Sequence, residues 1–144
     1  MLHTLLQHST QLNIKNVYVV LRSKKDKAAS QRGAELLASS IYSGLSTSIV
    51  TILQGDVSLP NLGLKSRPST KITKVIHLAA SVSFTQPLKD AYACNTRSTL
   101  NVVELCKSLE AKLCHFSTAF IHNDVKVYKQ DLGKGWDAKA VQKR

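Results

Sequence analysis

Short apolar runs alternate with helical stripes of apolar residues from residue 1 to about residue 122. Four apolar runs predict strands, which we place at Asn16–Arg22, Ser48–Gln54, Lys74–Leu78 and Lys112–Ser117. The first run is continuous rather than alternating. That pattern is typical of a strand buried on both faces of a parallel sheet.

Between the strands, apolar residues at helical spacing predict helices over Met1–Gln11 and Ala28–Tyr42. A longer stripe follows Pro87 and predicts a helix of about five turns, which the proline can open because it needs no N–H bond there. Asn95 falls on the apolar face of this helix, so we expect a buried amide with hydrogen-bond partners. Strands separated by helices predict an α/β fold with a doubly wound parallel sheet.

Length and composition fit one domain. The chain has 144 residues, of which 43% are hydrophobic and 20% charged. The apolar runs are all too short to cross a bilayer, and no secretory signal pattern opens the chain. Three scattered cysteines, at 94, 106 and 114, indicate reduced thiols and an intracellular protein.

The formal net charge of +11 is high for this length. Its simplest interpretation is a solvated basic surface. Attraction to anionic ligands, such as phosphorylated cofactors, is the second interpretation. Aromatic residues make up only 6% of the chain, so stacking platforms for nucleic acid are not expected. Beyond His122 the apolar pattern fails, and we predict a domain over 1–122 and a basic, poorly ordered tail over 123–144.

Charged residues follow the first two predicted strands. Arg22 ends the first strand, where a doubly wound fold meets the adenosine ribose, and its guanidinium suits a 2′-phosphate. Asp56 follows the second strand and is placed to accept a bond from an adenine amino group. The alternatives are a solvated basic turn at Arg22 and an ordinary Gly-Asp turn at Asp56.

Small and neutral polar residues follow the next two strands. Ala79 and Ala80 would let the backbone approach a flat ligand, or else serve packing alone. Asn95 would hold a water or a backbone carbonyl near an active site, or else be a satisfied core amide. A hydroxyl from Ser117 or Thr118 could hydrogen-bond a substrate carbonyl, although Ser-Thr is common after strands.

Several of these signals also occur together as an ordered set of motifs. The motifs are Val17–Arg22, Gly55–Leu64, Val75–Phe84, Leu88–Tyr92 with Asn95–Arg97 and Leu100, and Phe116–Phe120. In this order and spacing they resemble the male sterility or fatty acyl-CoA reductase family of the extended short-chain dehydrogenases/reductases. The chain is also similar to the thioester reductases of carrier-protein synthases, but its sequence at 82–84 and 88–91 is closer to that of the acyl-CoA enzymes.

The resemblance implies a partial Rossmann-like domain and an oxidoreductase of lipid metabolism. Such enzymes use NADPH to reduce a fatty acyl-CoA, or another acyl thioester, to an aldehyde and commonly then to an alcohol. The resemblance also implies an intracellular location, in the cytoplasm or on the cytoplasmic face of an organelle membrane. The cofactor residues would be Arg22 at the 2′-phosphate, Asp56 and Val57 at the adenine, and Ala79, Ala80 and Asn95 along the cofactor. Asn95 would also support the active site, where Ser117 or Thr118 would bond the thioester carbonyl.

The sequence departs from the family pattern at two catalytic segments. The first strand and its Gly-x-x-Gly-x-x-Gly turn are missing, and no Tyr-x-x-x-Lys pair occurs. A smaller departure is Ser98, where the family usually has Gly. We therefore expect a fragment that is inactive alone and has unpaired strand edges where the first strand would lie.

Two other functions stay open from the sequence. One is another extended short-chain reductase, of the epimerase or hydroxysteroid dehydrogenase type. The loop Leu59–Leu64 argues against it. The other is a non-enzymatic basic protein that binds phosphorylated partners or nucleic acid.

Overall fold

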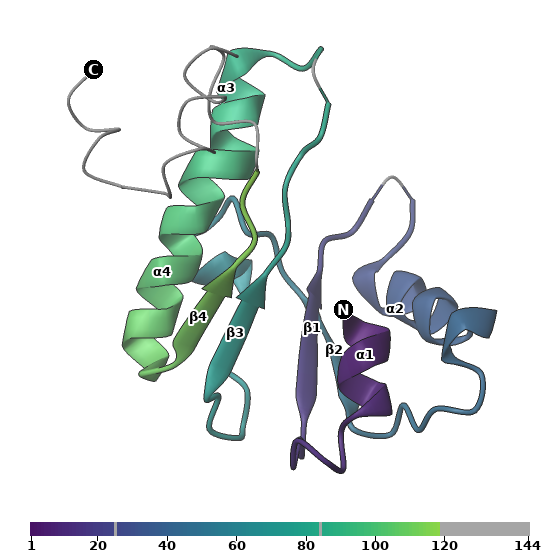
Figure 1. Ribbon diagram of the computed structural model, residues 1–144. Coiled ribbons are helices and arrows are strands. Elements are labelled where there is room, and N and C mark those ends of the chain that lie inside the picture. Colours follow the sequence, from purple (N-terminus) through teal and green to yellow (C-terminus); the bar gives the residue numbers. More distant parts are fainter. Residues whose placement is uncertain (25, 84, 119–144) are drawn as a thin grey trace, which may run out of the picture.

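The computed structural model describes residues 1–24, 26–83 and 85–118 of the chain (Figure 1). Helices and strands are interspersed along these residues, and a π-helical turn, Tyr92–Arg97, joins the last two helices. The helices are α1 (Leu2–Gln7), α2 (Ala29–Leu37), α3 (Leu88–Ala91) and α4 (Ser98–Leu109). The strands are β1 (Val17–Leu21), β2 (Val50–Gln54), β3 (Lys74–His77) and β4 (Lys112–His115). The predicted strands are thus confirmed; β1 is shortened at both ends and each of the others at one end.

The strands form two parallel pairs, β1 with β2 and β3 with β4. The first pair aligns Leu21 with Gln54, and the second aligns His77 with His115. The arrows of β1, β3 and β4 point the same way in Figure 1, so the carboxyl ends of both pairs lie at one edge. No ladder joins β1 to β3 in the part of the chain that the structure describes. Each of these two strands therefore keeps one edge without backbone pairing.

Helix α2 lies against β2 at Gly33. A Cβ on this residue would lie 2.4 Å from Cγ1 of Ile52 and 2.9 Å from its Cδ1. Glycine inside a helix costs about 0.5–1 kcal/mol relative to alanine, so close packing must offset a poor local propensity. The neighbouring Arg32 donates from Nη1 to the carbonyl of Arg22, which ties α2 to the end of β1.

The two strand pairs share one hydrophobic core. Its buried members are Leu62, Val102, Leu105 and Cys106, with Val20 of β1, Val75 of β3 and other half-buried side chains packed against them. Burying such a side chain stabilises a fold by about 1.5–3 kcal/mol. Side chains of α4 thus hold together two sheets that, within the described residues, share no backbone hydrogen bonds.

The loop after β2 reaches this core through an unusual turn. Asn61 and Leu62 both have left-handed backbone angles, with φ of 50° and 56°. This turn buries the Leu62 side chain and aims its carbonyl at the N–H of Asp56, 2.7 Å away. A Cβ at Gly55 would lie 2.6 Å from the same carbonyl oxygen, so only glycine fits there.

Two burial predictions are wrong. All of β1 is half-buried, although its apolar run predicted a strand covered on both faces. Its unpaired edge explains the difference. Asn95 is exposed rather than buried, and Leu88 and Tyr92 on the same helix are 85% and 51% exposed. Figure 1 shows α3 lying beyond the carboxyl ends of β3 and β4, where no strand covers it.

The structure describes no helix long and apolar enough to cross a membrane. The predicted tail over 123–144 and the end of the predicted domain lie outside the described residues.

Candidate functional site

Most of the predicted site residues follow strands at one edge, whereas Asn95 lies in the π turn Tyr92–Arg97. Arg22 comes directly after β1, and Asp56 comes two residues after β2. Ala79 comes two residues after β3, and Ser117 and Thr118 follow β4. Since the strands run in one direction, this is the carboxyl edge, where open α/β sheets bind ligands.

A basic hollow lies at the carboxyl end of β1. It measures about 390 Å³ and is lined by Lys24, Asp26, Lys27 and Arg32. Lys27 also bonds Glu35, with its Nζ 2.7 Å from Oε1, which neutralises part of this charge. Lys24 and Arg32 remain beside the Asp26 carboxylate, and their N–H groups are donors that suit phosphate oxygens.

Asp56 is held by bonds that favour its charged form. The N–H and the hydroxyl of Ser58 both donate to its Oδ1, at 2.9 and 2.7 Å. Burial raises the pKa of this carboxyl, but the Ser58 bonds and the positive charge of Arg22 outweigh it and bring the pKa below its ordinary value. The positive charge of Arg22 acts on Asp56, so the ends of β1 and β2 bring these two side chains close enough to interact electrostatically.

Val57 contributes to the core through its side chain and to the loop through its backbone. The side chain packs against the hydrophobic cluster. Its carbonyl accepts a 2.9 Å bond from Nδ2 of Asn101, a buried residue of α4. The sequence prediction missed Asn101, although a polar residue amid an apolar helical stripe was a usable signal.

Asn95 clamps the loop that follows β3. Its Oδ1 accepts from the N–H of Ser81 at 2.7 Å, and its Nδ2 donates to the Ser81 carbonyl at 3.1 Å. Ala79 and Ala80 lie between this clamp and the end of β3, and both are exposed. Their proposed contact with a cofactor stays a prediction.

Two histidines lie side by side where β3 and β4 end. Their rings stack with centroids 5.1 Å apart. His77 is buried, and burial, helped by the positive charge of His115, lowers its pKa. Ser117 and Thr118 lie just beyond His115 and are exposed. The role of either hydroxyl stays a prediction.

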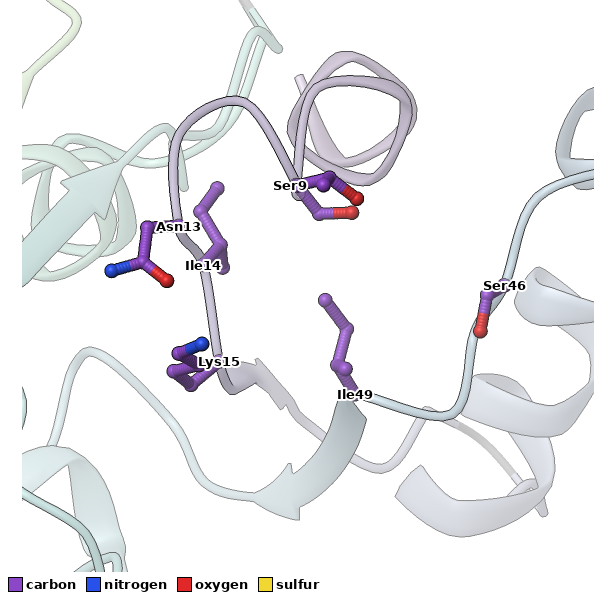
Figure 2. A pocket seen from close by; sticks show the side chains of 7 residues that line it. Ser9, Asn13, Ile14, Lys15, Ser46 and Ile49 are labelled. Atoms are coloured by element: carbon purple, nitrogen blue, oxygen red, sulfur yellow. The ribbon is translucent and has the colours of Figure 1, made fainter.

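A second hollow lies at the opposite edge, where β1 and β2 begin. It measures about 360 Å³. Ile14 and Ile49 point into it, and Ser9 and Ser46 lie on its rim (Figure 2). It brings together none of the predicted site residues, and the sequence carried no signal for it.

Comparisons with known proteins identify the family of this chain. The family described as "Male sterility protein", an NAD-binding family, matches residues 1–141. The fatty acyl-CoA reductase wat of Drosophila melanogaster is 31% identical over 131 residues, covering 83% of this chain and 25% of its own. A fatty acyl-CoA reductase of Arabidopsis thaliana is 28% identical over 134 residues, covering 79% and 27%.

A solved structure shares the fold. The terminal R domain from the myxalamid PKS-NRPS biosynthetic pathway superposes with a TM-score of 0.57 at 22% identity, covering 81% of this chain and 31% of that one. The chain is therefore a partial Rossmann-like α/β domain of the nicotinamide-nucleotide-binding class. It belongs to the male sterility family and is a fatty acyl-CoA reductase-type domain. It spans about a quarter of the length of the curated relatives it matches.

Proposed function

We propose that this chain is the nucleotide-binding part of an NADPH-dependent reductase of fatty acyl-CoA thioesters. The observation that carries the proposal is the meeting of Arg22, Asp56 and the basic hollow at the carboxyl ends of β1 and β2. A 2′-phosphate distinguishes NADPH from NADH. Cations at this position bind the 2′-phosphate and therefore favour NADPH over NADH.

The residues of this hollow fit the nucleotide half of the cofactor. Lys24 and Arg32 of the hollow, together with Arg22 beside it, would hold the 2′-phosphate, and Arg32 already ties α2 to the end of β1. Both Ser58 bonds go to one oxygen of Asp56, so the other oxygen can accept from the adenine amino group. Val57 would lie beside the adenine.

The carboxyl ends of β3 and β4, which form the neutral half of the edge, would bind the reacting groups. When bound, the nicotinamide supplies a hydride. Ala79 and Ala80 would lie along the cofactor, and a hydroxyl of Ser117 or Thr118 would donate to the thioester carbonyl. Val82, Leu88 and Tyr92 are exposed apolar side chains near this edge, which an acyl chain could cover.

The proposed role of these residues is binding rather than turnover. No Tyr-x-x-x-Lys pair occurs in the sequence, and it is the Tyr of that pair that donates the proton in the family. The names of the Drosophila and Arabidopsis relatives support the acyl-CoA substrate.

Titration calorimetry with NADPH and NADH tests the cofactor assignment. We expect NADPH to bind about tenfold more tightly, equivalent to roughly 1.4 kcal/mol, and Arg22→Ala to remove this preference while leaving NADH binding unchanged. Lys89→Ala on α3 is the control, since it removes an exposed cation outside the hollow. Equal affinities in the wild type, or an unchanged preference in Arg22→Ala, would contradict the proposal.

Titration with a long-chain acyl-CoA tests the substrate assignment. Leu88→Ser should weaken binding of the acyl-CoA but not of free CoA, because only the acyl chain needs the apolar contact. Equal weakening for both ligands would place the substrate elsewhere.

A further inference from the structure

The long helix changes its hydrogen-bond pattern next to the candidate site. Its sequence predicts an uninterrupted helix, yet Tyr92–Arg97 forms a π turn between α3 and α4. A π turn pairs each carbonyl five residues on instead of four, so the regular ladder is broken where it rejoins the α-helix. Such turns are rare and occur often at functional sites.

Two hydroxyls bond the carbonyls at this break. Ser98 donates from Oγ to the Cys94 carbonyl at 2.5 Å, and Thr99 donates from Oγ1 to the Asn95 carbonyl at 2.8 Å. A side chain that bonds the carbonyl four residues back competes with the helix ladder and favours a local bend. The bonds of Ser98 and Thr99 therefore favour the π turn at this point of the helix.

Thr99 also connects the turn to a strand. Its Oγ1 lies 3.4 Å from Nε2 of the buried His77, the last residue of β3. The single proton of the Thr99 hydroxyl goes to the Asn95 carbonyl, so the contact with His77 is a hydrogen bond in the tautomer that carries its hydrogen on Nε2. Asn95 in turn grips both backbone groups of Ser81. A chain of bonds thus runs from the end of β3 through α4 and back to the loop after β3.

We propose that Thr99 is a positioning residue for the loop Leu78–Ser83. Its hydroxyl holds the π turn in the shape that aims the Asn95 amide at Ser81, and this fixes the backbone of Ala79 and Ala80 at the carboxyl edge. The ligand that this loop receives rests on the proposed function. The positioning itself does not, because all of its bonds are within the chain.

Amide hydrogen exchange by NMR on the full chain tests the positioning. Thr99→Val keeps the side-chain shape and removes the hydroxyl, so we expect the Ser81 amide to exchange about tenfold faster, while core amides of α4 such as Val102 keep their rates. Thr99→Ser should restore slow exchange at Ser81. Ser108→Ala is the matched control, since Ser108 bonds the Leu105 carbonyl on the same helix but outside the turn.

Wild-type exchange of Ser81 in Thr99→Val would overturn the proposal, as would an equal rise at every amide, which would mean only a general loss of stability. A second measurement separates this proposal from the proposed function. Thr99→Val should weaken NADPH binding several-fold. Faster exchange at Ser81 in a protein whose wild type binds no nicotinamide nucleotide would support the positioning role and contradict the proposed function.

Discussion

The two strand pairs of this domain place different kinds of side chain at the same carboxyl edge. The β1–β2 pair ends in charged side chains, with Arg22 and Asp56 beside a hollow lined by two lysines, an arginine and an aspartate. The β3–β4 pair ends in alanines, hydroxyls and two stacked histidines, and a network of neutral hydrogen bonds holds its loop. Charges act over several ångströms and tolerate loose geometry, whereas close approach and hydrogen bonds require a rigid backbone.

This difference explains where each half obtains its order. In the charged half, Arg22 and Lys24 are exposed on the turn after β1, which the Arg32 bond ties to α2, and Asp56 is half-buried in the loop after β2. The neutral half is organised by α4 and the π turn. The shared core and the Asn101 bond are what join them, so these contacts should be the most sensitive to substitution.

The largest effect is expected at the shared core. Leu105→Ala leaves a cavity between the cluster residues of α4 and the side chains of both sheets, and should lower the free energy of unfolding by about 2–5 kcal/mol. Urea titration followed at both halves checks this. Loss of one half with the other unaffected would show that the halves are independent.

The bond between Asn101 and the β2 loop should have the next largest effect. Asn101→Ala leaves the Val57 carbonyl without its 2.9 Å partner at a buried site, which should cost about 1–3 kcal/mol. The same variant should weaken nucleotide binding more than it weakens binding of the acyl group, because the loop carries Asp56. Unchanged stability in a urea titration would show that water replaces the amide.

A smaller effect is expected within the charged half. Gly33→Ala gains helix propensity but places a Cβ 2.4 Å from Cγ1 of Ile52, so α2 must move or Ile52 must change rotamer. We expect a net loss of about 1 kcal/mol by thermal or urea unfolding. Adding Ile52→Val should recover part of it. A more stable Gly33→Ala would mean that α2 does not press on β2.

The smallest effect is a pH dependence in the neutral half. Burial, followed by the charge of His115, lowers the pKa of His77, so the unfolded chain takes up this proton more readily than the folded one. Stability should therefore be complete above the unfolded pKa of about 6.5 and fall as the pH drops below it. His115→Gln should reduce the slope only in part, because burial remains. An unchanged slope in His77→Gln would assign the pH dependence to other groups.

The sequence by itself determined the elements and the edge on which the site residues lie. Apolar runs placed the four strands of the described residues, and Arg22, Asp56, Ala79 and Thr118 follow them along the carboxyl edge. This information is local, because strand and helix periods depend on which neighbours along the chain are apolar. The ordered motifs added the family, which the comparison with known proteins confirms.

Only the tertiary structure decided burial, the π turn and the partners of each side chain. Asn95 lies on a predicted apolar face yet is exposed, because α3 and the π turn extend past the strands that would have covered them. Leu62 reaches the core through a left-handed turn, which the spacing of apolar residues along the chain does not predict. The grip of Asn95 on Ser81 joins residues 14 positions apart. Such contacts depend on how elements pack in space, and the order of residues along the chain does not contain that geometry directly.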